Sequence, residues 1–148
     1  MVVNLGTGTD TLAGGAGDDT LTGTGGNNLL IGGTGTDTMT GSGGGDILIA
    51  GYTSWDANYT ALRGILAEWT SADPLADRVG DISGPPAGGS YRNGAFYLNA
   101  GTVFSDGSQD KLSASGGSDW YFVDLNGADV TPKDKVTGNT GSSIITAI

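Results

Sequence analysis

Residues 5–49 read LGTGTDTLA GGAGDDTLT GTGGNNLLI GGTGTDTMT GSGGGDILI, which are five consecutive units of nine residues. The fourth position of each unit is glycine, and the eighth is leucine or methionine. The sixth position carries a short side chain with an oxygen, at Asp10, Asp19, Asn28, Asp37 and Asp46. Because self-similarity at a fixed period is the signature of repeat architectures, this stretch predicts a solenoid.

Each unit has the composition of a tight turn followed by a short strand. Glycines in the turn portion of the unit permit the positive φ angles that such a turn needs. The single apolar residue at position eight points inward, and its two neighbours point outward. Two units then complete one coil, with units one, three and five on one side and units two and four on the other. The sequence therefore predicts an all-β fold, a parallel β-roll.

The overall composition excludes several classes of protein. The chain has 148 residues, 29 of them glycine, and a formal net charge of −10 at pH 7. It has no histidine and no cysteine, which rules out a Ser-His-Asp triad, histidine-based zinc sites, thiol nucleophiles and disulfides. Six bases against 16 acids argue against nucleic-acid binding. No apolar run approaches the roughly 18 residues that a membrane-spanning helix needs.

The acidic residues indicate a metal. Glu68 is the only glutamate, and all other acids are aspartates. Neighbouring coils lie about 4.8 Å apart, and two carboxylates at that spacing repel by roughly 3 kcal/mol at an effective dielectric constant of about 20. Turn carbonyls and aspartate oxygens would form a hard, all-oxygen ligand set that favours Ca²⁺. A Ca²⁺-free β-solenoid is the alternative interpretation of the same repeat.

The pattern GGxGxDxUx, seen in GGAGDDTLT and GGTGTDTMT, resembles the repeats-in-toxin (RTX) nonapeptide. The resemblance implies a parallel β-roll with Ca²⁺ inside its turns, roughly three to five ions in all. Family members are usually secreted by type I systems and fold outside the cell. Runs such as DANYTALRGILAEW and GGSDWYF are also similar to the C-terminal region of RTX proteins, which implies a C-terminal module of a longer chain.

The resemblance also implies which residues bind the ions. Each ion would be shared by turns two units apart, which pairs Asp10 with Asn28, Asp19 with Asp37 and Asn28 with Asp46. Backbone carbonyls would complete the cages, at Gly6, Gly8, Gly15, Gly17, Gly23, Gly32, Gly33, Gly35 and Gly41. The third unit departs from the pattern because asparagines replace its acids. The sites that use Asn28 are therefore expected to be weaker.

After residues 1–51, the β-roll block, the period stops, and residues 52–92 are expected to form a helical insert and loop. Apolar residues from Trp55 to Trp69 recur at helical spacing, and Thr53-Ser54-Trp55-Asp56 has the form of a capping box. A second helix is expected with Asp73 as its N-cap, running toward Ile82 and ending before the break at residues 84–89. The aromatic stripe of Trp55, Tyr59 and Trp69 could stack on sugars, but packing on the roll or capping it is the favoured interpretation.

Residues 93–148 are expected to form a degenerate second block of the roll and a C-terminal tail. The nine-residue phase returns over residues 96–122, with Val103 in an inward position and Asp110 and Asp119 as candidate calcium ligands. Asp106 is a weaker candidate, and Asp134-Lys135-Val136 is too isolated to count. The tail GSSIITAI at residues 141–148 is compatible with either a type I secretion signal or a closing strand.

These observations favour a calcium-binding, secreted, extracellular module that folds on binding Ca²⁺ and follows an upstream domain of a longer chain. The alternative is a structural subunit of a surface layer, filament or adhesin, since the open ends of a roll can self-assemble. A polysaccharide-acting enzyme fragment is the least favoured, because the acids sit at turn positions that metal binding explains. We therefore expect no enzymatic activity.

Overall fold

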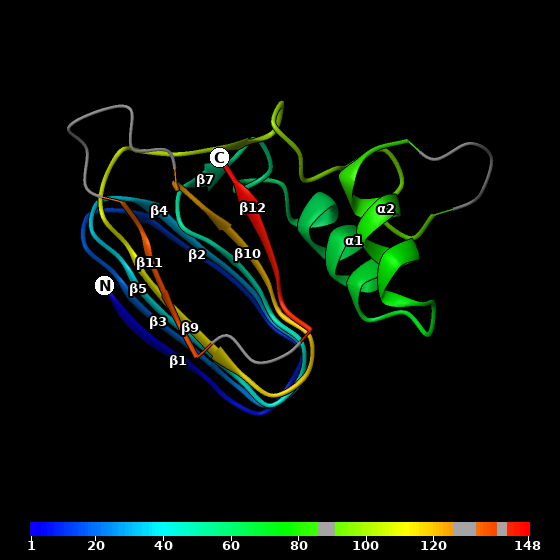
Figure 1. The fold of residues 1–148 in the computed structure, drawn as a ribbon, viewed down its shortest axis with the longest axis horizontal. Coiled ribbons are helices and arrows are strands. Elements are labelled where there is room, and N and C mark those ends of the chain that lie inside the picture. Colours follow the sequence, from blue (N-terminus) through cyan, green and yellow to red (C-terminus); the bar gives the residue numbers. More distant parts are fainter. Residues whose placement is uncertain (86–90, 126–132, 139–141) are drawn as a thin grey trace.

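The computed structural model describes residues 1–85, 91–125, 133–138 and 142–148. Two parallel sheets face each other and form a roll, and a pair of helices lies beside it (Figure 1). Within the described residues, no helix is long and apolar enough to cross a membrane.

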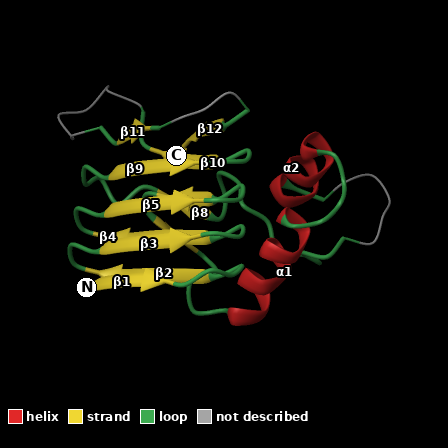
Figure 2. Cartoon of the chain, turned by 90° about the horizontal axis from the view of Figure 1, so that it is seen from below, coloured by secondary structure: helices red, strands yellow, loops and turns green. Residues whose placement is uncertain are grey.

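Alternate strands of the chain build the two five-stranded sheets of the roll. The first sheet contains, in spatial order, β1 (Val2–Leu5), β3 (Thr20–Thr24), β5 (Thr38–Ser42), β9 (Lys111–Ser115) and β11 (Lys135–Thr137). The second contains β2 (Thr11–Ala16), β4 (Leu29–Thr34), β6 (Ile47–Ile49), β10 (Trp120–Val123) and β12 (Ile144–Ala147). Neighbouring strands in both sheets are parallel. The predicted all-β parallel roll is confirmed, and Figure 2 shows its coils stacked from the N-terminal end upward.

The register of the strands fixes the length of a coil. Leu12 lies opposite Leu30 in the second sheet, and Leu21 lies opposite Met39 in the first. The members of each pair are separated by two repeat units, as the sequence predicts. Met39 then lies opposite Leu112, so the roll resumes after an insert with its register intact.

Two hydrophobic cores lie on either side of the second sheet. The inner core fills the roll with the residues at position eight, including Leu21, Leu30, Met39, Leu48, Leu112 and Tyr121. The outer core lies between this sheet and the helices, and it contains Leu29, Ile31, Ile47, Ile49, Trp120 and Phe122. Parallel strands that are buried on both faces need apolar residues at every position. This explains why β4, β6 and β10 contain LLI, ILI and WYF, whereas β3 and β5 contain TLT and TMT.

The helices α1 (Tyr59–Trp69) and α2 (Leu75–Ser83) cover the outer face of the second sheet. Leu62, Ile65 and Leu66 of α1 pack into the outer core. The Trp69 indole Nε1–H also donates to the Gly45 carbonyl oxygen, 2.8 Å away, in a turn of the roll. The insert therefore lies on the flank of the roll, as the favoured interpretation predicts.

The helix starts differ from the prediction by a few residues. Asp56 does reach back to Thr53, whose backbone N–H donates to Asp56 Oδ1 over 3.0 Å, but this interaction closes a turn ahead of the helix. The N-cap of α1 is Asn58, whose side chain accepts the Ala61 backbone N–H at 3.1 Å. The N-cap of α2 is Pro74, with no side-chain hydrogen bond, rather than Asp73. Most of the expected break at residues 84–89 lies within residues 86–90, which are outside the described residues.

The insert leaves and rejoins the roll through a short antiparallel pair. β7 (Tyr52–Thr53) pairs with β8 (Val103–Phe104), and this brings the two ends of the insert together. Val103 was expected at an inward position of a roll coil, and that expectation is wrong. It is buried in the outer core because residues 96–104 close the insert instead of forming a coil.

Residues after 105 complete the roll, although part of this segment lies outside the described residues. β9 continues the first sheet and β10 continues the second. β11 pairs with β9 through Val136 and Leu112, so Asp134-Lys135-Val136 belongs to the repeat after all. β12 pairs with β10, which makes Ile144–Ala147 a strand of the roll. Residues 126–132 and 139–141, including the start of the predicted tail, are not described.

Candidate metal centre

The aspartates of the turns line up in two columns, one at each side of the roll. The first column consists of the residues that directly precede strands of the first sheet: Asp19, Asp37, Asp110 and Asp134. The second column comprises the residues that precede strands of the second sheet: Asp10, Asn28, Asp46 and Asp119. The three predicted pairs, Asp10 with Asn28, Asp19 with Asp37 and Asn28 with Asp46, are direct neighbours in these columns.

A continuous ladder of hydrogen bonds joins the residues of the first column. The Asp19 backbone N–H donates to Asp37 Oδ1 over 2.8 Å, and the Asp37 N–H donates to Asp110 Oδ1 over 2.6 Å. The Asp110 N–H donates to Asp134 Oδ1 over 2.9 Å. At the N-terminal end, the Met1 ammonium group pairs with Asp19 Oδ1 in the place of a backbone N–H. One oxygen of each carboxylate is therefore committed to the fold.

The second column repeats this arrangement. The Asp10 N–H donates to Asn28 Oδ1 over 3.2 Å, and the Asn28 N–H donates to Asp46 Oδ1 over 2.7 Å. The Asp46 N–H donates to Asp119 Oδ1 over 2.9 Å. Asp110 and Asp119, predicted from the degenerate block, thus occupy the same positions as the aspartates of the regular repeats.

The second oxygen of most turn carboxylates has no partner among the described residues. Five such Oδ2 atoms are buried without a hydrogen bond, those of Asp19, Asp37, Asp46, Asp110 and Asp119. The five residues are at most 3% exposed. A buried carboxylate oxygen without a partner carries a substantial desolvation cost, which a bound cation would offset.

Glycine at the first position of a unit keeps the space beside these oxygens open. A Cβ atom on Gly14 would lie 2.4 Å from Asp19 Oδ2 and 2.5 Å from the Gly32 carbonyl oxygen. A carboxylate oxygen and a backbone carbonyl oxygen therefore converge on one point. The Gly32 carbonyl is one of the predicted ligands, and its position fits that role.

One coil further lies a candidate ligand that the sequence reasoning missed. A Cβ atom on Gly32 would lie 2.5 Å from both Asp37 Oδ2 and the Ala50 carbonyl oxygen. Ala50 follows Gly32 by two repeat units, and it therefore repeats the role of Gly32 in the preceding coil. Ala50 is the first residue after the fifth nine-residue unit, and this place could have identified it. The residues that follow it do not match the repeat pattern. In the fifth unit, a Cβ on Gly41 would lie 2.3 Å from Asp46 Oδ2.

The other predicted glycines lie in the tightly stacked turns. Gly15, Gly17, Gly33 and Gly35 all have positive φ angles. A Cβ on Gly33 would lie only 1.9 Å from the Gly15 carbonyl oxygen, so side chains are excluded where one turn stacks on the next. The Gly8 carbonyl oxygen faces the turn above in the same way, close to Gly26. Gly6 lies in the first turn with open space around it.

Asn28 changes the chemistry of the second column. Its Nδ2 donates to Asp46 Oδ1 over 2.9 Å, and Nδ2 lies 2.8 Å from the position of a Cβ on Gly23. In the second, fourth and fifth units this place beside the first glycine holds a carboxylate Oδ2. An amide N–H cannot ligate a cation, and it neutralises part of the charge on Asp46 instead. This provides a physical reason for the expected weakness of the sites at Asn28.

Asp134 ends the first column in a different way. Asp134 Oδ1 accepts from Asp110, and its Oδ2 accepts the Asp124 backbone N–H at 2.7 Å. Both of its oxygens are therefore satisfied by the chain itself. Asp106, the weaker candidate, also has both oxygens engaged, with Oδ2 accepting the Gly35 N–H at 2.8 Å and Oδ1 accepting the Ser108 N–H. Asp106 therefore holds the segment after the insert to the turn at Gly35. Asp134 holds the end of the first column to Asp110 and Asp124.

Burial raises the pKa values of several carboxyl groups in the turns. Desolvation by burial raises the pKa of Asp37 to about 6, with further contributions from neighbouring aspartates, and it raises the pKa of Asp46 to about 6. The same cause raises the pKa of Asp110 to about 7. Among the described residues, no group of three or more carboxylates forms a metal site by itself. A cage here would therefore hold at most two carboxylates, and backbone carbonyls or water would supply its other ligands.

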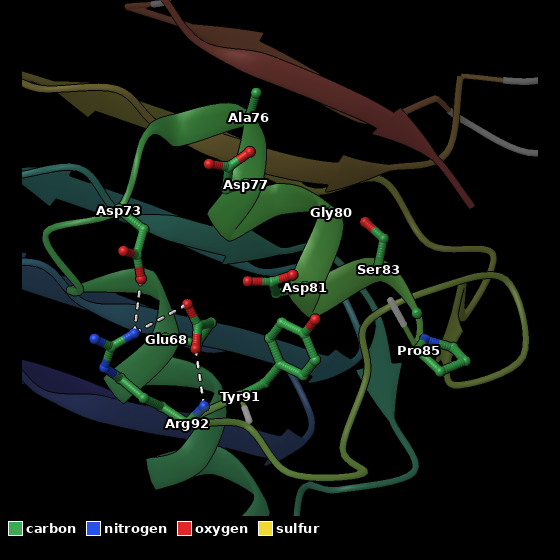
Figure 3. Close-up of a pocket in the computed structure, with 11 residues that line it drawn as sticks. Glu68, Asp73, Ala76, Asp77, Gly80, Asp81, Ser83, Pro85, Tyr91 and Arg92 are labelled. Carbon is green, nitrogen blue, oxygen red and sulfur yellow. Dashed lines mark hydrogen bonds and ion pairs between the residues drawn. The ribbon is translucent and has the colours of Figure 1, made fainter. Parts of the chain in front are cut away.

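A cavity of about 770 Å³ lies away from both columns, beside the two helices (Figure 3). Glu68 borders it, and its Oε2 accepts the Arg92 backbone N–H at 2.9 Å. The Arg92 guanidinium bridges Glu68 and Asp73, with distances of 3.4 and 2.8 Å. The single glutamate of the chain is thus paired, and it fastens the segment after α2 to α1.

Comparison with known families agrees with this geometry. Residues 4–39 and 22–51 match the family of the RTX calcium-binding nonapeptide repeat, described with four copies. The two matches overlap and together cover the part of the chain with the regular period. Searches of curated proteins and of solved structures found no match. Residues 4–51 are therefore similar to RTX calcium-binding nonapeptide repeats, and they lie in the parallel β-roll.

Proposed function

We propose that the RTX repeats of residues 4–51 and the strands that continue them form a secreted module that folds when it binds extracellular Ca²⁺. The observation that carries this proposal is the set of five buried Oδ2 atoms without partners in the described part of the chain. In the Ca²⁺-free chain these atoms must either stay protonated or remain charged without a counter-ion, and both alternatives cost free energy.

The columns suggest which residues hold the ions. In the first column, Asp19 and Asp37 would act with the Gly32 carbonyl, and Asp37 and Asp110 would act with the Ala50 carbonyl. In the second column, Asp46 and Asp119 carry the free oxygens. The remaining predicted glycine carbonyls would complete these cages. Ca²⁺ supplies positive charge between carboxylates that otherwise repel one another.

The stacking of the coils couples calcium binding to folding. Because the two carboxylates of a pair belong to different coils, the cage exists only when the coils are stacked. Binding free energy at such a site is therefore folding free energy. Sites of extracellular modules bind Ca²⁺ with dissociation constants of roughly 10⁻⁴–10⁻³ M, so the module would be unstable in the cytosol and folded outside the cell. Export in an extended state, as by a type I system, is consistent with this behaviour.

Far-UV circular dichroism during a Ca²⁺ titration, with Mg²⁺ as the control ion, tests the proposal. We expect a cooperative transition to β-structure near millimolar Ca²⁺ that chelator reverses. The variant Asp37→Ala should shift the midpoint to higher Ca²⁺, whereas Asp77→Ala, which removes an exposed carboxylate of α2, should not. A chain that is fully folded in chelator and unaffected by Ca²⁺ would contradict the proposal.

A structural subunit is the second candidate function, and one observation favours it. Within the described residues, β1 and β2 each pair on one side only, and the inward residues Leu5 and Leu12 of this first coil are only half-buried. Unpaired edges of this kind can pair with another chain. Sedimentation velocity with and without Ca²⁺ distinguishes the two functions, since a filament or layer subunit would assemble on addition of Ca²⁺ and a monomeric module would not.

A further inference from the structure

Tyr59 stands apart from the two tryptophans with which it shares a stripe in the sequence. Trp69 is fully buried, and Trp55 packs edge-on against Phe96 with ring centroids 5.2 Å apart. Tyr59, at the first position of α1, is 68% exposed. The tryptophans are therefore structural, and of the three rings Tyr59 is the one presented to solvent.

A cavity of about 380 Å³ lies between α1 and the first turn of the roll. Tyr59 and Arg63 contribute to it from the helix, and Asp10 contributes from the turn. Leu66 and Ala67 add apolar surface between them. A smaller hollow of about 260 Å³ also adjoins Tyr59 and Arg63, so both residues border two open spaces.

The polar groups of this cavity are available for a ligand. Asp10 is the lowest residue of the second column, and its N–H donates to Asn28, but no described residue donates a hydrogen bond to its carboxylate. The Arg63 guanidinium lies 5.6 Å from the centroid of the Tyr59 ring, and it makes no ion pair within the described part of the chain. One acid and one base therefore border the cavity in a chain whose net charge is −10.

The chemistry of the lining selects a class of ligand. The carboxylate of Asp10 disfavours anions, and Arg63 disfavours cations. An exposed aromatic ring beside apolar side chains, with a few convergent hydrogen-bonding groups, suits a ring that has an apolar face and polar edges. Neutral sugars have this character, because their C–H groups gather on one face and their hydroxyls project from the rim.

We infer that this cavity binds a pyranose ring of a neutral glycan, which stacks on Tyr59 and donates and accepts hydrogen bonds at Asp10 and Arg63. Tyr59 and Arg63 lie on α1, outside the columns, whereas Asp10 belongs to the second column. The proposed role of Ca²⁺ rests on the unpartnered oxygens of five other aspartates, so the two proposals can fail separately. A module of this kind would attach to a polysaccharide surface through the helical insert while the roll supplies a rigid support.

Saturation-transfer difference NMR with cellohexaose, maltohexaose and mannohexaose, each at millimolar concentration in Ca²⁺-containing buffer, tests the inference. We expect transfer to at least one of the three glycans. Tyr59→Ala should weaken binding by about tenfold or more, and Tyr59→Phe, which keeps the ring, by about twofold or less. Arg63→Gln should weaken binding through the loss of its charged donors. Tyr52→Ala is the matched control, because Tyr52 is also exposed but stacks on Phe104 away from the cavity.

Three results would overturn the inference. The first is the absence of transfer to all three glycans, with folding of the sample verified by circular dichroism. The second is binding that Tyr59→Ala leaves intact or that Tyr52→Ala weakens equally. The third is self-association of the glycan-free protein that Tyr59→Ala abolishes, since the cavity would then be occupied by a second copy of the chain.

Discussion

The backbone N–H of Asp37 donates to Oδ1 of Asp110 over 2.6 Å, although 73 residues separate the two in the sequence. The same interaction joins Asp19 to Asp37, which are only 18 residues apart. The hydrogen bond that joins the regular repeats to the degenerate block is therefore of the same kind as the bond between two regular repeats. The insert is accommodated at the side of the roll, and the column of carboxylates continues past it.

Asp110 should accordingly be as important for calcium-linked folding as any residue of the regular repeats. Asp110→Ala leaves the buried N–H of Asp37 without an acceptor, which costs about 1–3 kcal/mol, and also removes a free Oδ2. Asp110→Asn keeps an oxygen acceptor but removes the ligand charge. In chemical denaturation, we expect the alanine variant to be destabilised with and without Ca²⁺, and the asparagine variant to lose stability mainly in Ca²⁺. Equal losses in both conditions for both variants would contradict a ligand role.

Asn28→Asp should create an additional calcium site in the second column. The substitution replaces an amide N–H with a carboxylate oxygen beside Gly23, where the neighbouring units already have one. Without Ca²⁺, the new charge would repel Asp46 by up to roughly 3 kcal/mol at an effective dielectric constant of about 20. We expect lower stability in chelator, higher stability in millimolar Ca²⁺, and one more bound ion by native mass spectrometry. An unchanged ion count would show that the second column does not bind Ca²⁺ beside Gly23.

The Ca²⁺-free protein should become less stable as the pH rises from about 5 to about 7. Burial raises the pKa of Asp37 and Asp46 to about 6 and that of Asp110 to about 7, whereas an unfolded aspartate has a pKa near 4. The folded state therefore binds more protons in this range, and the free energy of unfolding falls with increasing pH.

Calcium should reverse this pH dependence, because the ions displace the protons from the carboxylates. Thermal unfolding at pH 5 and pH 8, in calcium-depleted buffer and in buffer with millimolar Ca²⁺, measures both effects. We expect the higher Tm at pH 5 without Ca²⁺ and at pH 8 with it. The same order of Tm values in both buffers would argue against shared carboxylate sites.

Much of the roll could be predicted because its period is regular over residues 5–49. The spacing of Leu21 and Met39 defined the coil, and the aspartates at the sixth positions defined the columns. The Ala50 carbonyl was missed because the insert interrupts the period, and Asp134 was missed because it follows Asp110 by more than two repeat units. A local signal for Asp134 existed, since Asp110-Lys111-Leu112 and Asp134-Lys135-Val136 share one pattern. The covered face of the second sheet was not predicted, although the continuous apolar runs of β4 and β6 carry a signal for it.

The outer core should contribute substantially to stability, chiefly through Trp69. Trp69 is fully buried, lies 5.8 Å from Trp120 between ring centroids, and donates to the roll at Gly45. Trp69→Ala should therefore cost about 3–5 kcal/mol in Ca²⁺-containing buffer, measured by urea denaturation. Trp55→Ala, at a half-buried position, is the control and should cost less. Similar values for both variants would mean that the helices pack on the roll more loosely than the structure indicates.

The most direct test of the calcium account is a crystal structure of the Ca²⁺-loaded protein with anomalous difference maps. We predict peaks beside the Oδ2 atoms of Asp19, Asp37, Asp46, Asp110 and Asp119, and none beside the Nδ2 atom of Asn28. Peaks that are absent from these five positions at saturating Ca²⁺ would contradict the account, because the buried carboxylate oxygens would then have to be satisfied by protons or water.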